Sequence, residues 1–453
     1  MLCKGVVLSL VTRKKTASIT AFVALAFLCI APQRSFLPQG AEFYNINWSQ
    51  IVVLLASLLC FGLLMPEIRR QRSLPRFLKF AWPLLLYTLV EGAFWIYGYG
   101  HRLDPTIHHS CAQSWWFNYA NTIILLPLVF FLGYLINWDE KMQMAFVATV
   151  FSALTIIVVG EYLYANGISN PIGDVVHYLN TNTDAIWQWS PSFESLRVTG
   201  LYRTPTVLAT FTLLGMGWAL AVRTSTVART IIFLDSFFIL FLTASRIEMI
   251  AAVILVLCAL IIKIQKRGMR EWIKRSFVAV VIGVLICGAG AYIYSEQFAH
   301  NDTAGILSRM EASDEQTQSL SEAPTSEDFV TRLDQLSSGR ISLWSKAFKV
   351  LQKHPYGTGM PSGTYLKAHV HNDFLAKYFT EGILGIVLLV MMYAWISGLS
   401  DGAYAHDLGL YFAVIFFVVC FFNCLFAHVP ILLPFFFFLG LNVSRNQGER
   451  AFT

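Results

Sequence analysis

Long apolar runs alternate with short polar connections along most of the chain. An apolar run of about 17 or more residues can span the hydrocarbon core as a helix, because the helix satisfies its own backbone polar groups in lipid. The pattern therefore predicts an all-α integral membrane protein with about twelve transmembrane helices. We place these spans at residues 16–32, 49–66, 80–98, 117–136, 143–164, 204–222, 230–244, 247–264, 277–295, 377–397, 408–426 and 429–443.

Two pairs of predicted spans are joined by very short connections. Only Ala244-Ser245-Arg246 separates the seventh span from the eighth, and a turn near His428 separates the last two. Each pair is expected to form a tight helical hairpin. The first run follows basic residues, as a signal peptide does, but the sequence after it lacks a small-residue cleavage site. We interpret this run as the first span.

Two polar segments interrupt the membrane pattern and are the expected outer elaborations of one membrane domain, residues 1–453. The first is 165–203. The second is 296–376, before the tenth span, where residues 308–328 are rich in Ser, Thr, Glu, Asp and Gln and are typical of a lid. Apolar residues then recur at helical spacing from Thr331 to Gln352, and Lys353-His354-Pro355 ends that predicted helix. Tyr356-Gly357-Thr358-Gly359 predicts a glycine-rich turn.

The distribution of Lys and Arg predicts the orientation in the membrane. If the N-terminus is cytoplasmic, 20 of the 33 basic residues fall on the cytoplasmic side. This bias is the positive-inside pattern. Both termini are therefore expected in the cytoplasm, with 165–203 and 296–376 on the outer side.

Composition agrees with a membrane protein and excludes other classes. The chain is 56% hydrophobic and only 13% charged, whereas soluble domains are about 25% charged. The net charge of +6 follows from the cytoplasmic bias, and the outer segment 296–376 is mildly acidic, so a nucleic-acid partner is not expected. Most of the eight cysteines lie in apolar runs, and their spacing suggests neither a disulfide framework nor a metal site.

The string His369-Val370-His371-Asn372-Asp373 lies where the second outer segment re-enters the membrane. His371 has three possible roles: a structural histidine, a metal ligand with His369 and Asp373, or a general base. The metal site lacks a second cluster to complete it. Histidine is the usual residue for taking a proton from a hydroxyl near neutral pH, with Asp373 or Glu381 as candidates to orient it. Gly382 and Gly385 follow, and we expect them to permit close helix packing.

Four arginines on the predicted outer side are candidate anion ligands. Arg246 lies in the hairpin between the seventh and eighth spans, and Arg340 is predicted in the first turn of a helix, where backbone N–H groups favour anions. Arg197 and Arg203 lie just before the sixth span. Each has an ordinary alternative, because an interfacial arginine often extends to lipid headgroups or to solvent. Together they make a cradle for a diphosphate plausible.

These residues resemble the bacterial O-antigen ligase family. The resemblance rests on His371-Asn372, nine residues and then Gly382-x-x-Gly385, on the Ser245-Arg246 hairpin, and on Gly339-Arg340 through Gly359. It covers roughly residues 195–395. It implies a GT-C-type fold and a metal-independent, inverting glycosyltransferase at the periplasmic face of the bacterial inner membrane.

The resemblance also implies substrates and roles. The donor would be a glycan on undecaprenyl diphosphate and the acceptor a sugar of lipid A-core, as in lipopolysaccharide biosynthesis. His371 would be the general base, and Arg246 and Arg340 would hold the diphosphate. Arg197, Arg203, His369, Asn372 and Asp373 would contact substrate. No cofactor, metal or nucleotide is expected, and no nucleotide-binding fingerprint occurs.

Other functions remain open at this stage. An O-antigen or exopolysaccharide polymerase of the same superfamily would use the same donor, and a related protein O-oligosaccharyltransferase is a more distant alternative. A membrane transporter or lipid flippase is the alternative from another class. Charges inside the spans usually mark a transport pathway, but here they are few, with Glu91 and Glu161 the main ones.

Overall fold

The fold is all-helical throughout the part of the chain that the structure describes, with no strand in that part. A computed structural model provides the coordinates. It describes residues 2–30, 48–71, 73–100, 109–136, 138–181, 198–202, 204–222, 225–243, 245–267, 340–360, 362, 366, 370, 372–398, 406–421 and 429–450.

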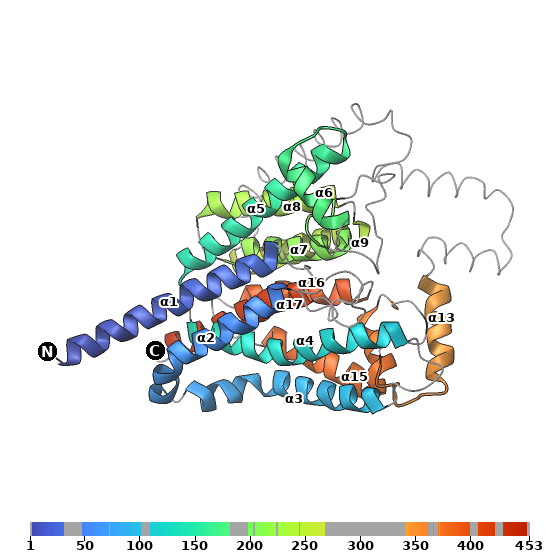
Figure 1. Ribbon diagram of the computed structural model, residues 1–453, viewed down its shortest axis with the longest axis horizontal. Coiled ribbons are helices and arrows are strands. Elements are labelled where there is room, and N and C mark those ends of the chain that lie inside the picture. The colour runs from blue at the N-terminus through green and yellow to red at the C-terminus, as the bar shows by residue number, and fades with distance from the viewer. Residues whose placement is uncertain are drawn as a thin grey trace.

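Thirteen helices lie within these residues, and most run roughly along one direction as a bundle (Figure 1). In chain order they are α1 (Leu2–Ile30), α2 (Trp48–Gln71), α3 (Ser73–Gly100), α4 (His109–Ile136), α5 (Glu140–Ala165), α6 (Pro171–Thr181), α7 (Pro205–Ala221), α8 (Thr226–Leu242), α9 (Arg246–Arg267), α13 (Arg340–Leu351), α15 (Asp373–Gly398), α16 (His406–Cys420) and α17 (Val429–Arg450).

Helices occupy eleven of the twelve positions predicted for spans; the position 277–295 lies outside the described residues. Among the described residues, four helices are long and apolar enough to cross a membrane: Ser49–Arg69, Phe77–Gly98, Glu140–Ala165 and Asp373–Gly398. Five shorter apolar helices accompany them, at Ile123–Ile136, Pro205–Ala221, Ile247–Ile262, Leu408–Cys420 and Ile431–Ser444. A membrane protein is therefore supported, while the count of twelve spans and the GT-C assignment stay predictions.

Large apolar side chains cover the outside of the bundle as well as its core. Leu89 is 72% exposed, Val253 60% and Ile383 63%, although each belongs to a long apolar helix. Soluble monomers rarely expose contiguous apolar surface of this kind. The outer face of the bundle is therefore suited to lipid.

The core is densest where α4 packs against α17. Phe435, Phe436, Phe437 and Phe438 are all buried, so this part of α17 is apolar on every side and enclosed by protein. A side-chain carbon on Gly133 would lie 2.2 Å from the carbonyl oxygen of Phe437, which means that the two backbones approach closely. Trp395 of α15 also reaches this core, donating through Nε1 to the carbonyl of Phe80 at 2.8 Å.

Helix α15 is interrupted at Gly382. This glycine has φ 64° and ψ −150°, a conformation that only glycine adopts readily. The carbonyls of Phe379 and Thr380 lie just before the break. They accept from the N–H groups of Thr358 and Gly359, both at 2.8 Å. The predicted glycine turn at 356–359 is therefore confirmed, and its function in the fold is to complete a broken helix.

Gly382 was expected to permit close packing against another helix. It permits close packing, but its neighbour is a turn, so the expectation is wrong. A side-chain carbon on Gly382 would lie 2.7 Å from the carbonyl carbon of Tyr356, so the glycine admits the turn instead of another helix. The turn is also held from the opposite side, because a side-chain carbon on Gly98 of α3 would lie 2.0 Å from the carbonyl oxygen of Gly359. Gly385 makes room for the carboxylate of Glu381 in the same helix, 2.4 Å from its added carbon.

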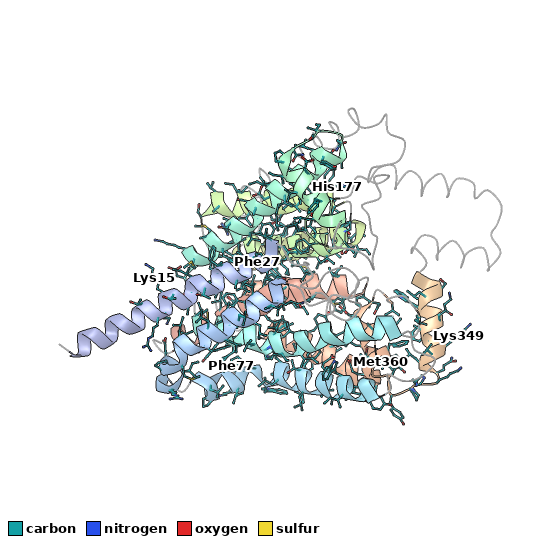
Figure 2. All side chains as sticks on the ribbon, viewed as in Figure 1. Lys15, Phe27, Phe77, His177, Lys349 and Met360 are labelled. Atoms are coloured by element: carbon teal, nitrogen blue, oxygen red, sulfur yellow. The ribbon has the colours of Figure 1, made fainter. Side chains whose placement is uncertain are left out.

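Two short helices lie outside the membrane pattern. Helix α13 ends at Leu351, as Lys353-His354-Pro355 predicts, and lies across one end of the bundle. Helix α6 was not predicted; it begins directly after Asn170 at the end of α5 that faces the same side as α13 (Figure 1). Figure 2 marks His177 on α6 and Lys349 on α13.

We expect Gly382→Ala to lower the free energy of unfolding by about 1–3 kcal/mol, because the alanine must adopt a glycine-only conformation. A shift of the thermal midpoint in detergent, followed by tryptophan fluorescence, measures this. Gly62→Ala is the matched control: its added carbon meets nothing within 4 Å on a regular helix, and Gly to Ala in a helix stabilises by up to about 1 kcal/mol. Equal midpoints for Gly382→Ala and the unchanged protein would contradict the break.

Candidate functional site

Three of the predicted site positions begin helices. Arg246 is the first residue of α9, Arg340 the first of α13 and Asp373 the first of α15. The prediction that Arg340 lies in the first turn of a helix is confirmed. His371, His369, Arg197 and Arg203 lie outside the described residues. Their placement stays a prediction, and the site is built here from the described residues around them.

Asn372 caps the start of α15 and ties it to α16. Its Oδ1 accepts from the N–H of Leu375 at 2.8 Å, which is the N-cap interaction. Its Nδ2 donates to the carbonyl of Phe421 at the end of α16, at 3.0 Å. Asn372 therefore has a structural role immediately after His371. Its contact with substrate stays a prediction.

Asp373 is buried in the first turn of α15, with 2% of its surface exposed. An acidic side chain at this position interacts favourably with the partial positive charge of a helix N-terminus. Asp373 therefore has a structural role at the start of α15, and its expected role in orienting His371 stays a prediction.

Arg340 lies on a helix that packs against the segment before His371. Trp344 donates through Nε1 to the carbonyl of Val370 at 2.6 Å. Ala347, Leu351 and Val370 form a small hydrophobic core with Leu375 and Phe379 of α15. This core fixes α13 to the first half of α15, so the backbone of Arg340 has a defined position relative to residue 370.

A buried carboxylate supports the start of α9. Glu248 is fully buried and accepts from the hydroxyl of Ser245, which precedes Arg246. The other oxygen of Glu248 accepts from the hydroxyl of Thr210 on α7, at 3.3 Å. Ser245 and Glu248 stand at the spacing of a capping box, Ser-x-x-Glu. The short connection predicted between α8 and α9 is confirmed and is fixed to α7, but α9 packs mainly on α16 and α7 and not on α8 as in a tight hairpin.

A second buried carboxylate holds the segment between Arg197 and Arg203. Glu161 of α5 accepts from the N–H of Thr199 at 3.0 Å, from the hydroxyl of Thr199 at 3.0 Å and from the N–H of Gly200 at 2.6 Å. Gly200 has φ 59°, which turns its N–H toward the carboxylate. Tyr202 donates from its hydroxyl to the carbonyl of Cys29 at 2.6 Å. Burial holds the pKa of the Tyr202 phenol well above its usual value, so it stays a donor.

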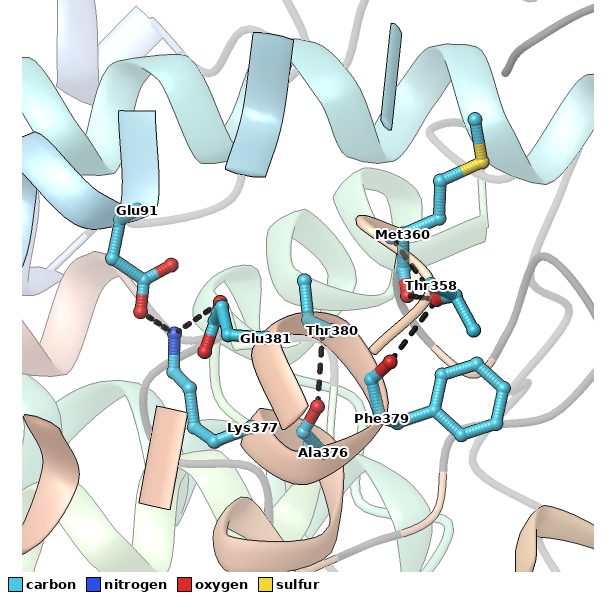
Figure 3. Close-up of polar contacts among 8 residues, drawn as sticks. All are labelled: Glu91, Thr358, Met360, Ala376, Lys377, Phe379, Thr380 and Glu381. Carbon is cyan, nitrogen blue, oxygen red and sulfur yellow. Dashed lines mark hydrogen bonds and ion pairs between the residues drawn. The ribbon is translucent and has the colours of Figure 1, made fainter. Parts of the chain in front are cut away.

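A cluster of three charged groups joins α3 to α15 below the start of α15 (Figure 3). The ammonium of Lys377 forms an ion pair with Glu91 and a second with Glu381, the latter at 3.5 Å. The ring of Tyr87 lies 5.1 Å from the same ammonium. All three charged residues are at most 6% exposed. Glu381, a candidate to orient His371, therefore has Lys377 as its described partner, and its effect on His371 stays a prediction.

These contacts bring the described neighbours of the candidate residues to one end of the bundle. Thr210 and Glu248 join the N-terminal parts of α7 and α9, and Asn372 joins α15 to the end of α16. Helix α16 in turn packs against both α7 and α9. Helix N-termini carry partial positive charge, which the buried carboxylates of Glu248 and Asp373 offset in the first turns of α9 and α15. The first turn of α13, where Arg340 lies, has no acidic residue and is suited to an anionic group.

Sequence reasoning missed the role of Lys377, because a charge at the edge of an apolar run was interpreted as the limit of the span. Glu91 and Glu161 were noted as charges inside spans, and such charges need partners. Pairing each acidic residue with a cation or donor on another span would have suggested Glu91 and Lys377. Among the described residues, no group of three His, Cys, Asp or Glu side chains is placed to hold a metal.

Comparison with known proteins identifies one region of the chain. A family model described as O-antigen ligase matches residues 231–390. This region runs from α8 to the second half of α15 and contains Arg246, Arg340 and His371. The chain therefore carries an O-antigen ligase region, and the family resemblance is confirmed there. No curated protein matches the chain.

We expect Lys377→Met to lower the free energy of unfolding by about 3–5 kcal/mol, because it leaves two buried carboxylates without their cation. Thermal unfolding in detergent measures this. Replacing Glu91 and Glu381 by Gln in the same protein is expected to recover most of the loss, since no uncompensated charge then remains. Lys353→Met, at an exposed lysine, is the control and should change little. Additive losses in the triple variant would contradict the cluster.

Proposed function

We propose that this protein is a membrane glycosyltransferase of the O-antigen ligase type. It would transfer a glycan from undecaprenyl diphosphate to a sugar hydroxyl of lipid A-core in lipopolysaccharide biosynthesis. The observation that carries the proposal is the match of residues 231–390 to the O-antigen ligase model. The positions of Arg246 and Arg340 as the first residues of α9 and α13 support it.

In the proposed reaction, His371 takes the proton from the acceptor hydroxyl. The hydroxyl oxygen forms a new bond to the anomeric carbon of the donor glycan as the bond from that carbon to the diphosphate oxygen breaks. Attack from the side opposite the leaving group inverts the configuration. The electron pair of the broken bond leaves with undecaprenyl diphosphate. The proton remains on the His371 imidazole until solvent removes it.

Arg246 and Arg340 are proposed to hold the diphosphate and stabilise the charge that grows on it as it leaves. A guanidinium can donate two parallel hydrogen bonds to a phosphate. Both residues are the first of their helices, so the backbone N–H groups of the same turn add to this field. Arg197 and Arg203 are second-rank ligands, and His369, Asn372 and Asp373 complete the proposed substrate contacts.

The polyprenyl diphosphate is already an activated donor, so the proposed mechanism requires no nucleotide, metal or other cofactor. The predicted location is the bacterial inner membrane, with both termini in the cytoplasm and the site on the periplasmic face. The N-terminus and Lys15 of α1 lie at the end of the bundle away from α13, which supports this orientation (Figures 1 and 2). Membrane lipids surround the apolar outer face.

The second candidate is a polymerase that uses the same donor and adds the glycan to a second lipid-linked chain. The same base and diphosphate ligands would serve both reactions, because only the acceptor differs. The motif His371-Asn372, nine residues, then Gly382-x-x-Gly385 favours the ligase. A transporter is disfavoured by the described charges within the spans, since Glu91, Glu161 and Glu248 each have partners within the protein.

His371→Ala is expected to lower kcat by about 10²–10⁴, the usual contribution of a general base. The assay follows transfer of glycan from purified undecaprenyl-diphosphate donor in detergent. Arg246→Ala and Arg340→Ala should each cost about 10²–10³, as the loss of one anion-stabilising donor does. His354→Ala is the control, because His354 follows α13 in the same outer segment and has no proposed role. Retention of a tenth or more of the activity by His371→Ala would overturn the base assignment.

The acceptor assay separates the two candidate enzymes. Purified protein is given lipid-linked donor with either lipid A-core or a second lipid-linked glycan, and products are separated by size. We expect transfer to lipid A-core, at an unchanged rate in EDTA because no metal takes part. Elongation of the second lipid-linked chain alone would identify a polymerase. Loss of transfer in EDTA would instead restore the metal site at His369 and His371.

A further inference from the structure

Helix α6 exposes an apolar stripe, and Ile172 at the edge of this stripe also contacts Gly160 of α5. Ile172 is 38% exposed, Val175 55% and Tyr178 64%, and Ile168 in the preceding turn is 54% exposed. These residues recur at spacings of three and four, so they lie on one side of the helix. Asp174 lies beside the stripe and is also exposed, whereas Val176 is buried with 3% exposure.

The opposite side of α6 is packed directly on α5. A side-chain carbon on Gly173 would lie 2.6 Å from the carbonyl oxygen of Gly160, which means that the two backbones are in contact. Asn170 caps α6, accepting from the N–H of Gly173 at 2.7 Å, and donates to the carbonyl of Gly160 at 3.0 Å. The ring of His177 stacks on Tyr164 with centroids 5.0 Å apart. Helix α6 therefore has a fixed position along the axis of α5.

For an α5 that is centred in a bilayer and normal to it, that position lies near the bilayer surface. Helix α5 has 26 residues, so it is about 39 Å long at about 1.5 Å per residue. The hydrocarbon core is about 30 Å thick, and a centred α5 extends about 4–5 Å beyond it at each end. Gly160 lies five residues before the end at Ala165, about 7–8 Å back along the helix. Helix α6 thus crosses α5 close to the boundary between acyl chains and headgroups.

We propose that α6 is a membrane-surface helix whose apolar stripe inserts into the acyl chains of the outer leaflet. An amphipathic helix at a bilayer surface buries its apolar face by about 5–10 Å at this boundary. Tyr178 has the amphipathic side chain that is enriched at this level. The charged residue on the described part of α6 is acidic, Asp174, so apolar contact and not attraction to anionic lipid holds the helix.

This placement sets the height of the segment between Arg197 and Arg203. Glu161, which binds Thr199 and Gly200, is the residue after Gly160, which contacts α6. The same turn of α5 therefore carries α6 on one side and residues 198–200 on another. If α6 lies at the acyl–headgroup boundary, residues 198–200 lie near that boundary too.

Nitroxide labels on single cysteines test the proposal in the full-length protein. The background replaces the native cysteines and is required to remain monodisperse and folded. Labels at Val175 and Tyr178 report on the stripe. Val253, 60% exposed on α9, is the acyl-chain reference, and Lys353, exposed after α13, is the water reference. The protein is placed in phosphatidylcholine vesicles, and relaxation by oxygen and by a water-soluble nickel chelate is compared.

We expect the labels at Val175 and Tyr178 to be relaxed more by oxygen than by nickel, as at Val253. The label at Lys353 should show the reverse preference. The pattern should persist when anionic lipid is added. A stripe relaxed mainly by nickel would place α6 in water and overturn the proposal. Labels shielded from both reagents would overturn it too, because protein and not lipid would then cover the stripe.

Discussion

The carbonyls of Phe379 and Thr380 determine how the outer part of α15 is built. A helix that breaks in the membrane leaves carbonyls without partners, and lipid offers none. Here the N–H groups of Thr358 and Gly359 donate hydrogen bonds to these carbonyls. The turn must come within backbone contact of the break, which is possible because Gly357 and Gly382 lack side chains. The position of the chain before His371 therefore depends on a backbone requirement at Gly382.

The ion cluster of Glu91, Lys377 and Glu381 also fixes the position of the first half of α15. It joins α3 to the part of α15 before the break, while Gly98 of α3 contacts Gly359 of the turn. Helix α3, the turn at 356–359 and the first half of α15 therefore each contact the other two. Breaking a buried ion pair costs more than its formation contributes, because a charge is left without compensation. The cluster consequently specifies the arrangement of these elements more than it stabilises the fold.

The sequence predicted the local features well and the long-range partners poorly. Apolar runs located eleven helices, Lys353-His354-Pro355 located the end of α13, and Tyr356 to Gly359 located the turn. These features are set by residues close in the chain. The partner of Gly382 and the pairing of Glu91 with Lys377 join residues that are distant in sequence, so periodicity gave no signal for them. Helix α6 did have a local signal, Asn170-Pro171, which is a capping residue followed by proline at the first helical position.

Buried carboxylates recur beneath the segments that carry the candidate arginines and histidine. Glu161 binds residues 199 and 200, Glu248 binds Ser245, and Glu381 lies two turns into α15. In a transport pathway, such charges would line a route through the membrane. Here each is buried and bonded within the protein: Glu161 and Glu248 hold connecting segments, and Glu381 pairs with Lys377. Charges that hold loops at one membrane surface suit a site whose substrates stay in that leaflet, and this is the property that the proposed transfer between two lipid-linked molecules requires.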